Sequence, residues 1–217
     1  MTTRVLLAGG TGLVGRLVAH GLRRRSDVEL ECLVRVSNFP DELAVDFEAL
    51  VADPSLGGGT TPVDVGICCL GTTMRKARSP AAFRRVDLDY TVAFARAARV
   101  RGADRFIIVS SVGAGGRGFY LRVKGEAEAA VAALGFRRLD ILRPSLLLGP
   151  RLDRRPAERI AQTMAPLLNL LLRRSLARYR AVDASVLARA IERLSMCTES
   201  GVQIHFVPGL IGLAAGR

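Results

Sequence analysis

The sequence contains no tryptophan, and among its 217 residues only two are histidine and four are cysteine. The cysteines, Cys32, Cys68, Cys69 and Cys197, show neither the spacing of a metal site nor a disulfide framework. We therefore expect no metal and free, reduced thiols. Cys68 and Cys69 are neighbours in an apolar run, so they should point to opposite faces of a strand.

Long hydrophobic runs are also missing. No stretch reaches the roughly 18 consecutive apolar residues of a membrane span. Residues 161–172 come closest, but Gln162, Pro166 and Asn169 interrupt them. The first ten residues carry glycines and no convincing cleavage site for a secretory signal. Together with the thiols, this predicts a cytoplasmic protein without a membrane span. We expect a monomer or a homodimer, although the sequence does not reveal the oligomeric state.

Lysine is scarce although the chain is strongly basic. Of 32 basic residues 30 are arginine, and only Lys76 and Lys124 are lysine; with 20 acidic residues the net charge is +12. The arginines are dispersed along the chain, and a charge total without an organised patch does not indicate nucleic-acid binding. An anionic small molecule remains compatible with the charge.

The start of the chain carries the strongest motif. The apolar run Val5 to Ala8 leads into Gly9, Gly12 and Gly15, and a helical pattern of apolar residues follows. In a strand, turn and helix, the first glycine permits the tight turn, the second lets a pyrophosphate approach, and the third lets the helix pack on the strand. The free N–H groups at the helix N-terminus then face the phosphates. We include Thr11, Leu13 and Val14 in this cofactor-binding turn.

Strand and helix patterns alternate along the rest of the chain. Strands are expected at 28–34, 43–47, 63–70, 105–110, 139–142 and 203–207, and helices at 80–101, 120–134, 156–173 and 183–196. Alternation of this kind predicts an α/β fold with a doubly wound parallel sheet, the Rossmann fold. We expect one domain over 1–217, in which 151–217 contributes the last strand and a small substrate-side extension whose residues 156–173 form an apolar lid or wall.

Tyr120 and Lys124 form the second notable pattern. Residues four apart lie on one face of a helix, and an ammonium group one turn away lowers the pKa of a phenol. Such a pair can donate a proton during catalysis, although a surface helix pair gives the same spacing. Ser111 follows an expected strand and could orient a substrate carbonyl or only cap its own loop.

Together these features resemble the short-chain dehydrogenase/reductase superfamily. The segments Cys68 to Thr73, Val86 to Tyr90 and Tyr120 to Glu126 are similar to its atypical branch around the Tat-interacting NADPH-binding proteins and their bacterial relatives. The similarity runs from residue 4 to about 151. It implies a Rossmann fold that binds NADP(H), with NAD(H) the less favoured alternative.

The resemblance also assigns roles to residues. It implies that Arg35 meets the 2′-phosphate, that Asp46 meets the adenine, and that Cys69, Leu70 and Gly71 line the cofactor. It makes Tyr120 the general acid. It implies that Lys124 adjusts the pKa of Tyr120 and binds the nicotinamide ribose, and that Ser111 orients the substrate carbonyl. Ser111 lies only nine residues before Tyr120, closer than is usual in the superfamily.

Two functions follow from these observations. The first is an NADP(H)-dependent oxidoreductase that acts on a small carbonyl or related apolar substrate. The second is a redox sensor or regulatory partner that binds NADP(H) without turning it over. The sequence identifies neither the substrate nor the pathway.

Overall fold

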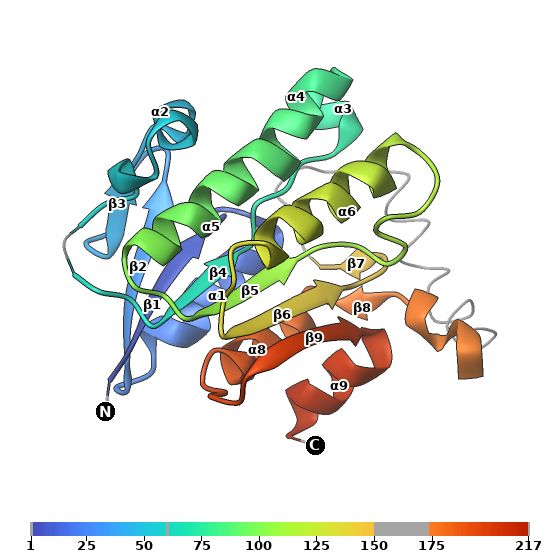
Figure 1. Ribbon diagram of the computed structural model, residues 1–217. Coiled ribbons are helices and arrows are strands. Elements are labelled where there is room, and N and C mark those ends of the chain that lie inside the picture. The colour runs from blue at the N-terminus through green and yellow to red at the C-terminus, as the bar shows by residue number, and fades with distance from the viewer. Residues whose placement is uncertain (1, 60, 150–173, 217) are drawn as a thin grey trace.

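The computed structural model describes residues 2–59, 61–149 and 174–216 of the chain (Figure 1). Parallel strands form one central sheet in the order β3-β2-β1-β4-β5-β6-β9, the arrangement of a doubly wound Rossmann fold. Its strands are β1 (Thr3–Ala8), β2 (Val28–Val34), β3 (Glu42–Ala44), β4 (Val65–Cys68), β5 (Arg105–Val109), β6 (Arg138–Arg143) and β9 (Gly201–Phe206). The predicted fold class is thereby confirmed.

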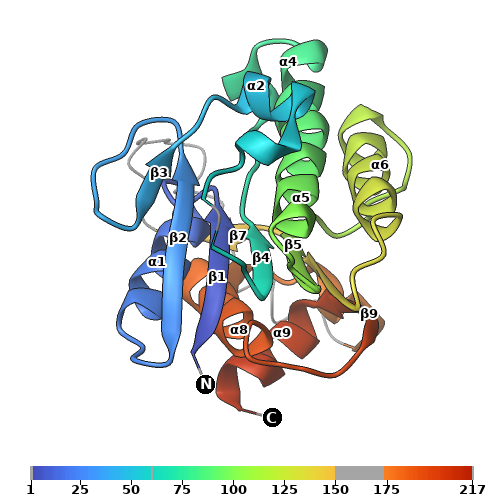
Figure 2. The same cartoon turned by 60° about the vertical axis from the view of Figure 1, so that its left-hand side comes forward.

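Helices cover both faces of the sheet (Figures 1 and 2). One face carries α1 (Leu13–Arg23), α8 (Ala184–Leu194) and α9 (Val207–Ala215). The other carries α2 (Phe47–Ala52), α4 (Pro80–Arg84), α5 (Thr91–Val100) and α6 (Phe119–Ala132), with the short α3 (Met74–Ala77) beside α4. A separate two-stranded sheet pairs β7 (Leu147–Leu148) with β8 (Val182–Asp183). Short 3-10 helices occupy Pro54–Leu56 and Arg174–Tyr179.

Side chains of successive strand residues enter two separate cores. Val5 and Leu7 of β1 pack in the core under α1 and α8, whereas Leu6 and Ala8 pack in the core under α5. This period of two explains why the buried strands are continuously apolar. It also places Cys68 in the second core and Cys69 against the first, as expected from their adjacency.

Several local features differ from the sequence prediction. The fourth strand, expected over 63–70, is limited to Val65–Cys68. The third strand ends at Ala44, because Asp46 accepts a hydrogen bond from the Glu48 N–H at 2.9 Å and starts α2 there. The helix expected over 80–101 contains a π-helical segment, Arg85–Tyr90, which we call the π turn. The apolar, glycine-containing residues of α9 were not expected to form a helix.

The C-terminal part completes the sheet. β9 pairs with β6 over its whole length, and α8 packs on α1 next to the first strand. The predicted helix over 156–173 lies outside the described residues. Among the helices that the structure describes, none combines the length and apolar character needed to cross a bilayer.

Candidate cofactor and active site

The glycine turn after β1 is held by close backbone contacts. Gly9 has a φ of +85°, and a Cβ on it would lie 2.5 Å from the Cys69 carbonyl. A Cβ on Gly15 would lie 2.1 Å from the Gly9 carbonyl oxygen. Two of the three glycines are therefore required by the packing of the turn against α1 and against the chain that follows β4.

Gly12 lies at the open end of this turn. It is exposed, donates its N–H to the Gly9 carbonyl at 3.0 Å, and caps α1 without a side-chain hydrogen bond. The next N–H groups, from Leu13 and Val14, have no acceptor within the helix by its geometry. Val14 buries its side chain in the core, so only its backbone can contact a ligand. A glycine turn without side chains, followed by helix N–H groups that have no cap, fits a pyrophosphate.

The remaining predicted cofactor residues border the same edge of the sheet. Cys69 and Leu70 are half-buried where β4 ends, and Gly71 is exposed. Arg35 is exposed directly after β2, and no described residue hydrogen-bonds or ion-pairs with it. Asp46 is exposed after β3, but its carboxylate is used as the cap of α2. In open parallel sheets, ligands bind outside the carboxyl ends of the strands, which is this edge.

Tyr120 and Lys124 occupy the first two turns of α6. The Tyr120 side chain is exposed and packs on the Phe83 ring with centroids 5.4 Å apart. Lys124 is buried, and its Nζ lies 2.7 Å from Oδ1 of Asp87. Burial alone would lower the pKa of Lys124, but the negative charges that Asp87 and Tyr120 can carry act in the opposite direction, and the net shift is upward. Lys124 is therefore a buried cation one helical turn from an accessible phenol.

Asp87 is the site residue that the sequence prediction missed. Its side chain is fully buried, and Oδ2 accepts a hydrogen bond from the Thr72 N–H at 2.8 Å. A Cβ on Gly71 would lie 3.5 Å from Oδ1 of Asp87 and 3.7 Å from Nζ of Lys124. The ion pair thus lies directly beneath a predicted cofactor-lining residue. A local signal existed, since an acid four residues after Phe83 falls on the apolar face of that helix.

Ser111 follows β5 and begins a glycine-rich loop that packs on α6. The Gly115 N–H donates to the Leu121 carbonyl at 2.8 Å, and a Cβ on Gly125 would lie 2.5 Å from the Gly115 Cα. This contact ties the loop that begins at Ser111 to the helix that carries Tyr120. The Ser111 hydroxyl makes a long hydrogen bond of 3.4 Å to the Val112 carbonyl. The neighbouring hydroxyl of Ser110 is buried without a hydrogen-bond partner among the described residues.

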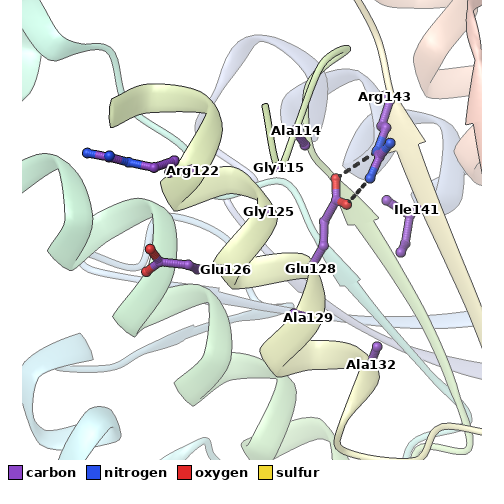
Figure 3. Close-up of a pocket in the computed structure, with 10 residues that line it drawn as sticks. All are labelled: Ala114, Gly115, Arg122, Gly125, Glu126, Glu128, Ala129, Ala132, Ile141 and Arg143. Carbon is purple, nitrogen blue, oxygen red and sulfur yellow. Dashed lines mark hydrogen bonds and ion pairs between the residues drawn. The ribbon is translucent and has the colours of Figure 1, made fainter. Parts of the chain in front are cut away.

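A cavity of about 540 Å³ lies on the other side of α6, between that helix, the loop after β5 and β6 (Figure 3). Glu128 points from α6 toward Arg143 of β6, and the two form a bidentate ion pair across the cavity. None of the predicted site residues is among the described residues that line it. This cavity is therefore distinct from the candidate active site.

Comparison with known sequences finds clear relatives. The chain is 40% identical over 166 residues to protein HTATIP2 of Rattus norvegicus, a match that covers 74% of this chain and 64% of the rat protein. It is 34% identical over 197 residues to the mitochondrial protein fmp52 of Aspergillus niger, covering 86% of this chain and 84% of the relative. No family model matches the sequence.

Solved structures resemble the fold at low sequence identity. Human epimerase family protein SDR39U1 with NADPH superposes with a TM-score of 0.65 at 16% identity, covering 95% of this chain and 75% of that one. RMD from Pseudomonas aeruginosa with NADPH gives 0.65 at 20% identity, covering 94% and 77%. WbmH of Bordetella bronchiseptica with NAD⁺ gives 0.69 at 14% identity, covering 95% and 76%. These likenesses agree with the Rossmann architecture.

The relatives correct one expectation. The sequence predicted a cytoplasmic protein, but the fungal relatives are named as mitochondrial proteins, which contradicts that prediction. Reduced cysteines and the lack of a long apolar run do not identify a compartment. The prediction of a cytoplasmic location was wrong because it was inferred from these two features. The sequence similarity covers most of the fungal relative and supports the predicted resemblance. The chain belongs to the atypical short-chain dehydrogenase/reductase family that contains HTATIP2 and FMP52.

Proposed function

We propose that the protein is an NADP(H)-dependent oxidoreductase that reduces a small carbonyl or related apolar substrate. The observation that carries this proposal is the pair on α6, an accessible Tyr120 one turn from a buried, charged Lys124 beneath Gly71. Two structural neighbours are described with NADPH, which supports the choice of cofactor. Arg35, exposed and without a partner among the described residues, offers a cation for the 2′-phosphate.

Different residues of the chain bind different parts of the cofactor. The glycine turn and the N-terminus of α1 hold the pyrophosphate, with Gly9, Gly12 and Gly15 providing room for its approach. Asp46 borders the adenine, and Cys69, Leu70 and Gly71 line the cofactor. Lys124 anchors the nicotinamide ribose with one of its three N–H donors, while another faces Asp87. NADPH, when bound, supplies the hydride.

Proton transfer is assigned to Tyr120. The Lys124 ammonium, one helical turn away, places a positive charge near the phenolate that proton donation would leave. Tyr120 then gives its proton to the carbonyl oxygen as the carbonyl carbon is reduced. Ser111 donates a hydrogen bond to the same oxygen and orients it. The substrate side includes residues from 151–217, within the single domain that we propose for 1–217.

A panel of aldehydes and ketones tests this function through NADPH oxidation. We expect substrate-dependent turnover that Tyr120→Phe reduces by at least about 100-fold, the usual contribution of a general acid. Tyr179→Phe serves as the matched control, because Tyr179 is exposed on the 3-10 helix away from these residues in sequence. Turnover that survives Tyr120→Phe would remove Tyr120 from the mechanism.

The alternative function is an NADP(H)-binding sensor or regulatory partner that performs no turnover. The Ser111 hydroxyl favours it, because that group faces the carbonyl of its own loop. This alternative predicts tight NADPH binding in fluorescence titration and no oxidation with any carbonyl in the panel. Sustained oxidation that depends on one substrate would exclude it.

A further inference from the structure

The ion pair between Asp87 and Lys124 joins three separate segments of the candidate site. Asp87 lies in the π turn, Lys124 lies in α6, and the Thr72 N–H that binds Asp87 belongs to the chain after β4. We propose that Asp87 is a positioning residue that holds the Lys124 ammonium in place and keeps it charged for Tyr120. This inference rests on the proposed function, because it assigns a role within the same proton-transfer pair.

The π turn explains how Asp87 reaches this position. A π turn widens the helix by one residue and is frequent at functional sites. Here the Thr91 hydroxyl donates to the Val86 carbonyl at 3.5 Å. This backbone carbonyl of the widened turn therefore has a hydrogen-bond partner. Asp87 is directed into the protein, whereas Asp89 lies half-buried and pairs with Arg85 at 3.1 Å. One turn thus carries two carboxylates with different surroundings.

The charge of Lys124 depends on few groups. Asp87 faces it from the π turn, Tyr120 from its own helix, and Cys68 from β4. Burial raises the pKa of the Cys68 thiol to about 11, so it is neutral at physiological pH. Asp87 is therefore the main group that opposes the effect of burial on the lysine, and its removal favours the neutral form of Lys124.

The pair has a direct consequence for Tyr120. A neutral lysine could neither stabilise a phenolate nor offer three N–H donors. Loss of the Asp87 carboxylate therefore moves the alkaline limit of carbonyl reduction to lower pH, since the reaction needs a protonated Tyr120 beside a charged lysine.

The scarcity of lysine makes a direct measurement possible. Lysine labelled with ¹³C at Cε gives two NMR signals in this chain, and Lys76→Arg identifies which belongs to Lys124. In the wild type we expect the Lys124 signal to titrate above the ordinary lysine value of about 10.4. In Asp87→Asn, which keeps an acceptor for the Thr72 N–H, it should titrate at least about one pH unit lower than in the wild type.

The activity measurement uses Asp89→Asn as the matched control, because it removes a carboxylate from the same turn. Asp87→Asn should move the alkaline limb of the pH profile of kcat down by at least about one pH unit, and Asp89→Asn should leave it in place. Asp87→Glu, which restores the negative charge, should return the limb toward the wild-type position. A merely structural role for Asp87 would change stability without moving this limb.

Two results would overturn the proposal. One is a Lys124 signal that titrates at the same pH in the wild type and in Asp87→Asn; the other is an unchanged alkaline limb in an active enzyme. If no carbonyl is turned over, the proposed function fails, but the NMR titration still decides the role of Asp87. If Asp87→Asn does not fold, a wild-type Lys124 that titrates at or below the ordinary lysine value of about 10.4 overturns the proposal.

Discussion

Gly15 and Gly9 are packed so closely that a Cβ on Gly15 would lie 2.1 Å from the Gly9 carbonyl oxygen. The overlap is with backbone, so no side-chain rotation can relieve it. This contact sets the distance between the start of α1 and the end of β1. It therefore also sets the direction of the free N–H groups at the N-terminus of α1. The third glycine of the motif is thus a packing requirement, and its effect on the cofactor is indirect.

Gly15→Ala is accordingly expected to destabilise the fold by about 1–3 kcal/mol, the usual cost of overpacking. Urea denaturation measures the change, and NADPH titration should show weaker binding because the turn has moved. Gly209→Ala in α9 is the control, since a Cβ there meets nothing within 4 Å. Helix propensity should make that control neutral or more stable by about 0.5–1 kcal/mol. Equal stability losses in both variants would contradict the packing argument.

Arg35 provides a test of cofactor choice. Arg35→Ala should weaken NADPH binding by about 1.5–3 kcal/mol, the contribution of hydrogen bonds to a charged group, and should leave NADH binding nearly unchanged. Calorimetry with both nucleotides measures the difference. Arg96→Ala removes the same charge from an exposed position on α5 and should affect neither nucleotide. If Arg35→Ala weakens both nucleotides equally, the guanidinium does not bind the 2′-phosphate.

The sequence predicted those parts of the site that local patterns encode. The apolar run before Gly9 and the spacing of the glycines define a strand, a turn and a helix within a few residues. Tyr120 and Lys124 are four apart in one helix, so their proximity also follows from local geometry. The parallel, doubly wound sheet followed from the alternation of strands and helices, because parallel neighbours require crossover connections.

Asp87 could not be assigned in the same way. Its role depends on a widened helical turn and on contact with Lys124 in a different helix, and neither follows from spacing along the chain. The cap at Asp46 had a local signal, since an aspartate two residues before Glu48 is typical of a helix N-terminus. The strand interpretation of 43–47 overlooked that alternative because the apolar residues alternate there.

Glu48 predicts a specific pH dependence. Hydrogen bonds from Arg85 and then from Tyr90 lower the pKa of Glu48 from 4.5 to about 2. A depressed carboxylate pKa means that its contribution to stability is present above the unfolded value and is lost as the pH falls from about 4.5 through about 2. The stability difference between the wild type and Glu48→Gln should therefore shrink over that interval.

The ¹³C chemical shift of the Glu48 carboxyl group measures this titration directly. Arg85→Gln should return the midpoint toward its ordinary value, since it removes the larger cause. Arg84→Gln is the neighbouring control, because Arg84 pairs with Glu126 on α6. A Glu48 midpoint near 4.5 in the wild type would show that the contact with Arg85 does not persist in solution.

Gly125 tests whether the loop after Ser111 is part of the site. A Cβ there would lie 2.5 Å from Cα and 2.6 Å from N of Gly115, so Gly125→Ala must push this loop away from α6. Because the loop begins at Ser111 and leads into Tyr120, we expect turnover to fall by at least about tenfold, equivalent to 1.4 kcal/mol in the barrier. NADPH affinity should change little, since the glycine turn lies on other elements. Hydrogen exchange at 112–118 should rise in the same variant, and unchanged exchange with unchanged turnover would show that the loop does not position Ser111 or Tyr120.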